Sequence, residues 1–221
     1  SFTIGPQVAA PSVALTSDTG ASYLDGITRA GGLTITGVET GATLLYSVAG
    51  GPASAIYDPP KLVESAHTLL LTQTAVAVNT STASSLSFTL DTKVAAPSVA
   101  LTSDTGASSL DGITRAGGLT ITGVETGATL LYSVDGGLAS ASYDPTKLLD
   151  GAHTVLVTQT DVAGNTSTAS SLSFTLDTKV AAPSVALTSD TGASSLDGIT
   201  RAGGLTITGV EIGTAPRCDG V

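Results

Sequence analysis

Apolar residues alternate with polar ones in short stretches of the chain, and the polar residue is most often threonine or serine. An alternation with a period of two gives one buried row and one wet row of side chains, as in half-buried β-strands. Threonine adds β-propensity on the wet face. The apolar rows that predict strands are Val99 and Leu101, Leu119 and Ile121, Val155 and Val157, and Leu172, Phe174 and Leu176.

Turn-forming sequences separate these stretches, and no stretch carries an apolar stripe with helical spacing. About seven short strands with a turn roughly every 8 to 12 residues are typical of a β-sandwich. The pattern therefore predicts an all-β fold. The turn sequences are Asp104-Thr105-Gly106, Asp111-Gly112, Asp135-Gly136-Gly137, Asp144-Pro145 and Ala163-Gly164-Asn165.

The chain repeats itself with a period of 86 residues. Val8-Ala9-Ala10-Pro11 returns as Val94-Ala95-Ala96-Pro97 and again as Val180-Ala181-Ala182-Pro183. This period is too long for a solenoid repeat and suits a small autonomous domain. The predicted parts are the last strand of a preceding repeat (1–7), repeat 1 (8–93), repeat 2 (94–179) and the truncated first half of repeat 3 with a divergent tail (180–221).

Charge and hydropathy exclude two classes of partner. Eighteen acidic and eight basic residues give a formal charge of −10. Binding to phosphate needs clustered Lys and Arg, so we expect no nucleic-acid partner. Apolar stretches are interrupted every few residues, so no transmembrane helix of about 20 residues fits and no membrane insertion is expected. The single Cys218 allows no internal disulfide.

Several motifs taken together resemble bacterial immunoglobulin-like repeats of large secreted or surface adhesins, of the RTX and biofilm-associated type. The resemblance covers almost the whole chain and implies tandem immunoglobulin-like β-sandwiches. It also implies an extracellular or cell-surface location, an extender role with neighbouring repeats as partners, and Ca²⁺ at domain junctions in many relatives. The distal ligand is not encoded. The motifs are Leu149-Asp150-Gly151-Ala152-His153-Thr154, Thr160-Asp161-Val162-Ala163-Gly164-Asn165 and Ser173-Phe174-Thr175-Leu176-Asp177-Thr178.

The resemblance leads to candidate Ca²⁺ ligands. In such a sandwich Asp91, at the end of repeat 1, is expected to approach Asp161, in the last loop of repeat 2. At the preceding junction the counterparts are Gly5 and Ala75, so both carboxylates are missing together. Converging carboxylates need a cation, and their hard oxygens suit Ca²⁺. A shared site and a chance coincidence among the differences between the repeats both stay open as interpretations.

Further acidic residues lie in the turns on the side of each repeat that faces the next. Asp18 and Asp25 are expected on the same side of repeat 1 as Asp91. Asp104 and Asp111 are their counterparts in repeat 2, with Asp177 as the counterpart of Asp91. Each can cap its own turn or also bind Ca²⁺.

The sequence predicts no enzyme. His67 and His153 occur once per repeat without a second metal ligand nearby, which favours packed or surface histidines. We therefore expect a non-catalytic extender, or stalk, of a bacterial adhesin. Two alternatives stay open: a module that binds carbohydrate or protein, and an accessory domain of a secreted hydrolase.

Overall fold

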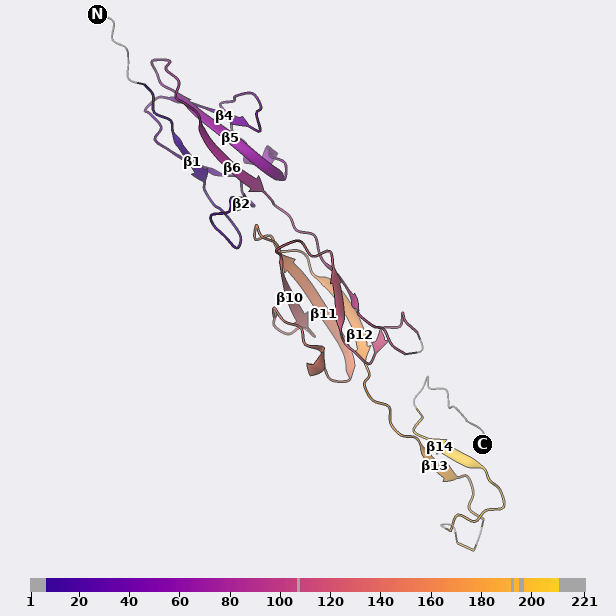
Figure 1. The fold of residues 1–221 in the computed structure, drawn as a ribbon. Coiled ribbons are helices and arrows are strands. Elements are labelled where there is room, and N and C mark those ends of the chain that lie inside the picture. The colour runs from indigo at the N-terminus through magenta and orange to yellow at the C-terminus, as the bar shows by residue number, and fades with distance from the viewer. Residues whose placement is uncertain (1–6, 107, 192, 195–196, 211–221) are drawn as a thin grey trace, which may run out of the picture. The chain divides into compact units, whose positions relative to one another are not determined.

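The computed structural model describes residues 7–106, 108–191, 193–194 and 197–210 (Figure 1). In this part of the chain the regular elements are short strands, apart from two single-turn 3₁₀ helices, η1 (Pro59–Lys61) and η2 (Pro145–Lys147). The predicted all-β class is confirmed. The strand predicted within 1–7 and the divergent tail 212–221 fall almost entirely outside the described residues.

The chain divides into two compact units. Residues 1–100, 121–143 and 155–172 form the first unit, and residues 101–120, 144–154 and 173–221 form the second. The domain boundaries inferred from the 86-residue period stay a prediction. None of the helices described is long and apolar enough to span a membrane.

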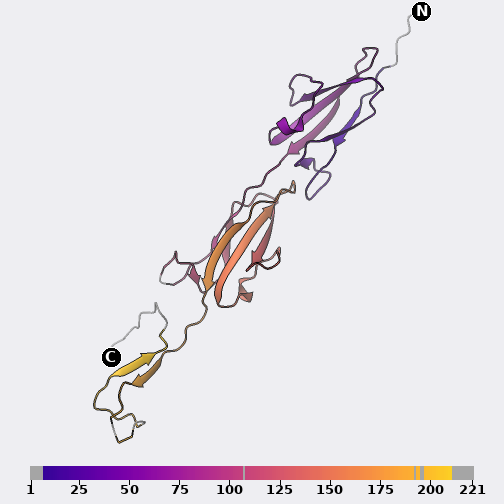
Figure 2. The ribbon, with the colours of Figure 1, turned by 180° about the vertical axis from the view of Figure 1, so that it is seen from behind.

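Repeat 1 contains three antiparallel strand pairs and one short parallel contact. Its larger sheet has the order β2-β6-β5-β4, and its smaller sheet is β1-β3 (Figures 1 and 2). The register pairs Ser12 with Thr36 in the smaller sheet and His67 with Phe88 in the larger one. The strands are β1 (Ser12–Leu15), β2 (Ile27–Thr28), β3 (Leu33–Thr36), β4 (Thr43–Val48), β5 (Ser65–Thr74) and β6 (Ser84–Leu90).

The core of repeat 1 lies on one face of β5 and β6. Leu69 and Leu71 are fully buried, while Leu70 between them is 41% exposed. Phe88 and Leu90 of β6 are also buried. This alternation is the period of two read from the sequence, and it removes several large apolar side chains from water at about 1.5–3 kcal/mol each.

Repeat 2 contains the same elements, each 86 residues later. They are β7 (Ser98–Leu101), β8 (Ile113–Thr114), β9 (Leu119–Thr122), β10 (Thr129–Val134), β11 (Gly151–Thr160) and β12 (Ser170–Leu176). The larger sheet has the order β10-β11-β12-β8 and the smaller is β7-β9. All four stretches predicted from alternation are strands.

Among the described residues, repeats 1 and 2 each have six strands, where about seven were expected. A single bridge, Tyr46 to Ser54 or Tyr132 to Ser140, stands where a further strand would lie. The following residues enter a 3₁₀ turn through Asp58-Pro59 and Asp144-Pro145. Proline fixes φ and has no N–H to donate to a ladder, so the strand cannot continue there.

A fully buried glutamine joins the two sheets in each repeat. In repeat 1 the Gln73 Oε1 accepts from the Glu39 N–H at 2.8 Å, and its Nε2 donates to the Ala9 and Gly37 carbonyls at 2.8 and 3.0 Å. Gln159 makes the equivalent three bonds in repeat 2. With its amide satisfied, this polar side chain is tolerated in the core.

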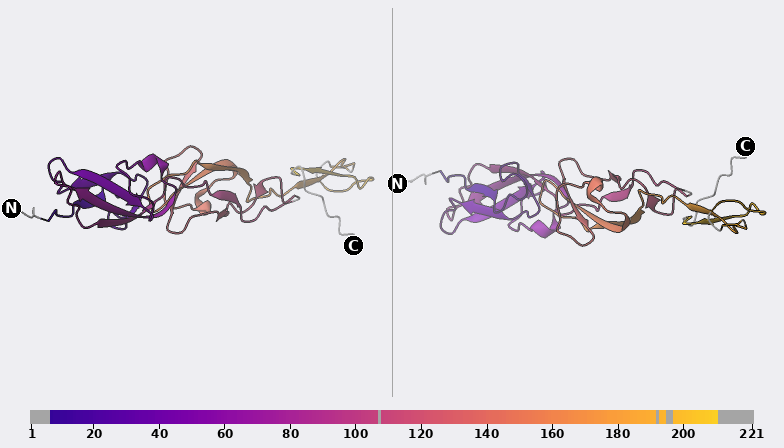
Figure 3. Two further views of the ribbon diagram at one scale, coloured as in Figure 1. Left: turned by 90° about the horizontal axis from the view of Figure 1, so that it is seen from above. Right: turned by 90° about the horizontal axis from the view of Figure 1, so that it is seen from below.

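The start of repeat 3 forms one more strand pair, β13 (Ser184–Leu187) and β14 (Leu205–Thr208). The two strands run side by side in both views of Figure 3. No third described strand hydrogen-bonds to this pair.

Candidate metal centre

Three carboxylates meet within the first compact unit. Asp91 directly follows β6, Asp161 directly follows β11, and Glu125 lies in the turn between β9 and β10. Each offers one carboxylate oxygen, and these oxygens all lie within 4.8 Å of one another. We call these three residues the acidic cluster. Two of its members, Asp91 and Asp161, are the pair that the sequence predicts to approach.

Asp161 is held by its own loop. Its side chain is buried, with 6% of the residue exposed. Its Oδ1 accepts from the Asn165 N–H at 2.8 Å, and its Oδ2 accepts from the Asn165 side-chain amide at 2.9 Å. The Asp161 N–H in turn donates to the Asn165 carbonyl at 3.0 Å. The carboxylate is thus fixed in position before any ligand binds.

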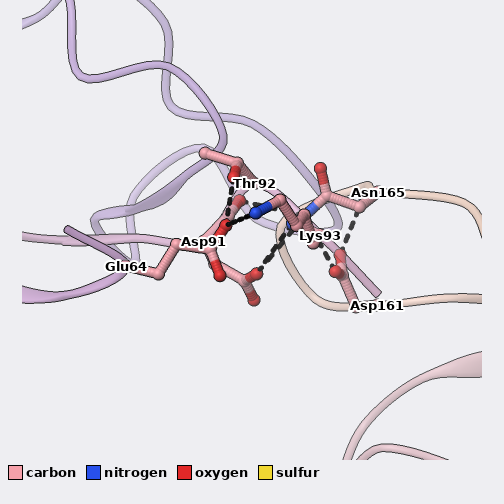
Figure 4. Close-up of polar contacts among 6 residues, drawn as sticks. All are labelled: Glu64, Asp91, Thr92, Lys93, Asp161 and Asn165. Atoms are coloured by element: carbon pink, nitrogen blue, oxygen red, sulfur yellow. Dashed lines mark hydrogen bonds and ion pairs between the residues drawn. The ribbon is translucent and has the colours of Figure 1, made fainter. Parts of the chain in front are cut away.

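Asn165 also connects this loop to the end of β6. Its Nδ2 donates to the Asp91 main-chain carbonyl at 2.9 Å and lies 3.4 Å from the Asp91 Oδ1 (Figure 4). The Asp91 Oδ1 also accepts from the Lys93 N–H at 3.4 Å. The amide of Asn165 therefore lies between the two aspartates and donates to both.

The electrostatics of the acidic cluster are unfavourable for three negative charges. Burial raises the pKa of Asp91 above its ordinary value, and the negative charge of Asp161 raises it further. Glu125 and Glu64 act in the same direction, while the Lys93 N–H lowers the pKa. A raised pKa means that the folded protein disfavours the ionised form of Asp91.

Lys93, two residues after Asp91, is paired with another carboxylate. Lys93 Nζ lies 3.8 Å from Glu64, and the Thr92 hydroxyl donates to the same carboxylate (Figure 4). The same arrangement recurs 86 residues later, where the N–H and hydroxyl of Thr178 donate to Asp150 at 3.0 and 2.7 Å. These bonds lower the pKa of Asp150, and the bond from the Thr178 hydroxyl has the largest effect. In both repeats an acidic residue thus accepts hydrogen bonds from the segment that directly follows the last strand.

The donor set of the acidic cluster fits a hard divalent cation. Ca²⁺ takes about 6–8 oxygen ligands from carboxylates, carbonyls and water. The acidic cluster supplies such oxygens from three separate chain segments, and one of its carboxylates is buried and held in place. The negative charges of the three carboxylates are not balanced within the cluster. A bound cation would remove the repulsion that raises the pKa of Asp91.

The other predicted ligands act within their own turns. Asp18 accepts from the Gly26 N–H at 3.0 Å, and Asp25 accepts from the Ile27 N–H at 3.0 Å. Asp104 and Asp111 repeat these bonds at 3.1 and 3.0 Å, and Asp177 lies 3.4 Å from the Lys179 N–H. Among the described residues none of the five belongs to a group of three metal-ligating side chains.

One oxygen in these turns stays without a hydrogen-bond partner. The Oδ1 atoms of Asp18, Asp104 and Asp190 are each buried and unpaired in the described structure. The same atom is therefore left unsatisfied in all three repeats, although its partner oxygen caps a glycine N–H. A buried unpaired acceptor costs free energy unless water or a cation reaches it.

Two residues of this centre are missed by sequence reasoning. Glu125 has a glutamate counterpart at Glu39, so a comparison of the repeats gives it no distinguishing signal. Asn165 reads as part of a glycosylation sequon, and its counterpart Asn79 is also an asparagine. The signal that could have found Asn165 is its position four residues after Asp161, in the same tight loop.

Hydrogen bonds to main-chain carbonyls of the loop that contains Asp161 lie beside the acidic cluster in the first unit. The Thr19 hydroxyl donates to the Ala163 carbonyl at 2.7 Å, and the Ala21 N–H donates to the Val162 carbonyl at 3.3 Å. Arg29 Nη1 donates to the Gly164 carbonyl at 2.9 Å. Three successive carbonyls of the 161–165 loop thus accept hydrogen bonds from residues 19–29, and no side chain of that loop takes part in these bonds.

A groove of about 760 Å³ lies beside the Glu64–Lys93 pair. It is lined by apolar and charged side chains, among them Arg29, Pro59, Pro60, Leu62, Glu64 and Lys93, and no aromatic residue lines it.

A comparison with family models agrees with the all-β fold. Residues 93–178 match a family model described as a bacterial Ig-like domain. Fibronectin(III)-like modules of CbhA from Clostridium thermocellum are similar at 14% identity and a TM-score of 0.36, over 75% of this chain and 94% of that chain. No curated protein matches the sequence. The matched region is similar to a bacterial Ig-like domain, and domains of this kind are typically non-catalytic.

Proposed function

We propose that this chain is a non-catalytic extender segment, part of the stalk of a bacterial extracellular adhesin, and that Ca²⁺ stiffens it. The acidic cluster carries the proposal, because Asp91, Glu125 and Asp161 come from two successive repeats and offer oxygens within 4.8 Å of one another. The match to a bacterial Ig-like domain model and the acidic, weakly charged composition support an extracellular location.

The cation would act as a cross-link. Asp91 begins the segment that joins repeat 1 to repeat 2, while Glu125 and Asp161 belong to turns of repeat 2. Binding of Ca²⁺ by all three residues would tie this segment to those turns and neutralise their charge. A ligand that binds only the folded state also raises stability by mass action. A stalk would then become stiff on reaching a medium that contains Ca²⁺.

The test is thermal unfolding of the whole chain with and without millimolar Ca²⁺, for the parent and for Asp91→Ala and Asp161→Ala. We expect Ca²⁺ to raise the parent midpoint by a few degrees and both substitutions to remove the rise. Asp177→Ala is the matched control, since Asp177 holds the same position in repeat 2 and belongs to no such cluster in the part described. An unchanged parent midpoint would leave a spacer without a metal.

A second candidate function is a protein-binding Ig-like module, and the groove beside Glu64 and Lys93 favours it. An accessory role beside a secreted hydrolase is compatible with the same groove. Leu62→Asp at the groove wall separates these functions from the extender: it should abolish capture of a groove ligand and leave the response to Ca²⁺ intact.

A further inference from the structure

Two residues of β3 leave their main-chain polar groups without partners. β1 and β3 pair antiparallel, and the Thr16 N–H donates to the Gly32 carbonyl at 2.9 Å. Directly opposed pairs in such a ladder alternate between bonded and non-bonded, so Leu33 and Ile35 make no main-chain bonds to β1. Their N–H and C=O groups point to the other edge of β3, where no described strand pairs with it. Within the part of the chain that the structure describes, these groups have no hydrogen-bond partner.

The free edge of β3 lacks two features that commonly protect an edge strand. Its sequence, Leu33-Thr34-Ile35-Thr36, contains neither a charged residue nor a proline. The edge of the larger sheet is partly covered instead, because Tyr46 of β4 exchanges two main-chain bonds of 2.8 Å with Ser54. An unprotected row of N–H and C=O groups at every second residue is the pattern that another extended chain satisfies.

A pocket of about 370 Å³ lies beside this free edge, between β3 of the smaller sheet and β4 of the larger. The stacked rings of Tyr46 and Tyr57 have centroids 5.6 Å apart, and the Tyr57 hydroxyl donates to the Gly31 carbonyl at 2.6 Å, so this wall is held in place. Ile56 at the rim is 77% exposed. The described residues that line the pocket include no charged one; they are Leu33, Ile35, Tyr46, Ala55, Ile56 and Tyr57.

A strand added to β3 would use the free edge and the pocket together. Successive side chains of a strand point to opposite faces, so every second side chain of the added strand lies on the same face as Leu33 and Ile35. That face lines the pocket, so these side chains would enter it and cover Ile56. They must be apolar, because the pocket offers no charge to pair with a charged group.

We propose that repeat 1 binds an extended peptide segment of another protein, which adds to the free edge of β3 as a further strand and places apolar side chains in the pocket beside Ile56. A second copy of this chain is disfavoured as the partner, because each copy carries a formal charge of −10. Strands both precede and follow β3 within repeat 1, so this free edge is not created by an end of the chain. No residue that lines the pocket belongs to the acidic cluster or to the groove beside Glu64 and Lys93.

The test follows hydrogen exchange of single amides in the full chain as a blocked probe peptide is added. In this peptide valine alternates with threonine, and a lysine at each end complements the acidic chain. We expect exchange of the Leu33 and Ile35 amides to slow by about tenfold or more at millimolar peptide, because each gains a carbonyl partner. The amides of Thr34 and Thr36, which face β1, should change far less.

Variants of the chain and of the peptide locate the bound strand. Ile56→Ser introduces the residue that repeat 2 has at this position, Ser142, and should weaken binding by about tenfold, because the peptide loses apolar contact. Leu138→Ser is the matched control and should leave binding unchanged, since Leu138 is 97% exposed and lies outside this pocket. N-methyl groups on one alternate set of peptide nitrogens should abolish the protection, and on the other set should leave it, because only one set faces β3.

Three results would overturn the proposal. The first is unchanged exchange of the Leu33 and Ile35 amides at millimolar peptide. The second is equal protection in the parent and in Ile56→Ser, since the peptide would then bind without the pocket. The third is protection of the same amides that rises with the concentration of the chain alone, which would make a second copy the partner of this edge.

Discussion

The carboxylates of Asp91 and Asp161 offer oxygens within 4.8 Å of each other, although one follows the last strand of repeat 1 and the other lies in the last loop of repeat 2. The side chain of Asn165 lies between them and donates to both residues. Two negative charges at this separation repel each other, and burial makes the repulsion stronger than in water. The pair therefore lowers stability until a cation or a proton neutralises it.

Removing the charge of Glu125 should separate cation binding from folding. Without Ca²⁺, Glu125→Gln should leave the unfolding midpoint unchanged or slightly raised, because one like charge is lost. With Ca²⁺, it should weaken the affinity by about tenfold, since affinity follows the number of charged ligands. Calorimetric titration of Ca²⁺ into the folded chain measures this. Glu39→Gln, the equivalent change in repeat 1, should leave the Ca²⁺ affinity as it is in the parent.

The pH dependence of stability should reveal Asp91. Its pKa is raised in the folded state, so its contribution to stability is fully present below the unfolded pKa and is lost as pH rises through the folded pKa. In the absence of Ca²⁺, Asp91→Asn should therefore unfold at a midpoint a few degrees above the parent at about pH 6 and equal to it at about pH 3.

With saturating Ca²⁺ near neutral pH, the parent should instead unfold at a higher midpoint than Asp91→Asn, because the ionised Asp91 then binds the cation. Thermal scans across pH, with chelator and with Ca²⁺, test both halves of the expectation. A parent chain that loses stability relative to Asp91→Asn on acidification would contradict it, since Asp91 would then be stabilising in its charged form.

A methyl group at Gly20 should disrupt the contact beside the acidic cluster. Gly20 has φ +99° and a Cβ there would lie 1.9 Å from the Val162 carbonyl oxygen. Gly106, its counterpart, has φ +120° but a Cβ would come no closer than 4.0 Å to the nearest atom. Both alanine variants meet the strain of a positive φ, and only Gly20→Ala adds a collision with main chain.

We therefore expect Gly106→Ala to cost about 1 kcal/mol of unfolding free energy, and Gly20→Ala to cost at least about 1 kcal/mol more. Urea unfolding measures both variants. Amide exchange in the 161–165 loop should accelerate only for Gly20→Ala. Equal effects of the two substitutions would mean that the close approach of Gly20 to Val162 does not matter for stability.

Local patterns in the sequence are sufficient for most of the strands. The alternation at Val155 and Val157 predicts β11, and the 86-residue period transfers it to β5, where Leu69 and Leu71 take the same places. The resemblance to immunoglobulin-like repeats predicts that Asp91 approaches Asp161, and the comparison of the repeats supports it, because Gly5 and Ala75 replace both carboxylates together. A difference between repeats is informative when it changes a charge.

Features that are equal in every repeat escape this reasoning. Glu125 and Asn165 have identical counterparts in repeat 1, so a comparison of the repeats does not mark them as members of a centre. Gln73 and Gln159 continue the buried rows of Leu69 and Leu71 and of Val155 and Val157, but only the structure shows which groups satisfy their amides. Such roles depend on contacts between segments far apart in the chain, which local periodicity does not encode.

Val78 and Gly164 hold equivalent positions in the last loops of repeats 1 and 2. Exchanging the two residue types tests the effect of backbone strain in both directions. Val78 has φ +68°, a conformation that costs a β-branched residue about 1–2 kcal/mol, and its counterpart Gly164 has φ +86°. Val78 is also 80% exposed, so its side chain contributes little packing. Val78→Gly should therefore stabilise the chain by about 0.5–1 kcal/mol, despite the greater freedom of glycine in the unfolded state.

Gly164→Val should do the opposite and cost about 2 kcal/mol or more, since it combines the strain of a left-handed valine with a collision. A Cβ at Gly164 would lie 3.2 Å from the Gly20 Cα and 3.3 Å from the Gly20 nitrogen. Urea unfolding of the two single variants gives both values, and Ca²⁺ titration of Gly164→Val should show a weaker affinity because the loop that holds Asp161 has shifted. A stabilised Gly164→Val chain would mean that this loop tolerates valine equally well in both repeats, and that strain at Val78 is not what separates them.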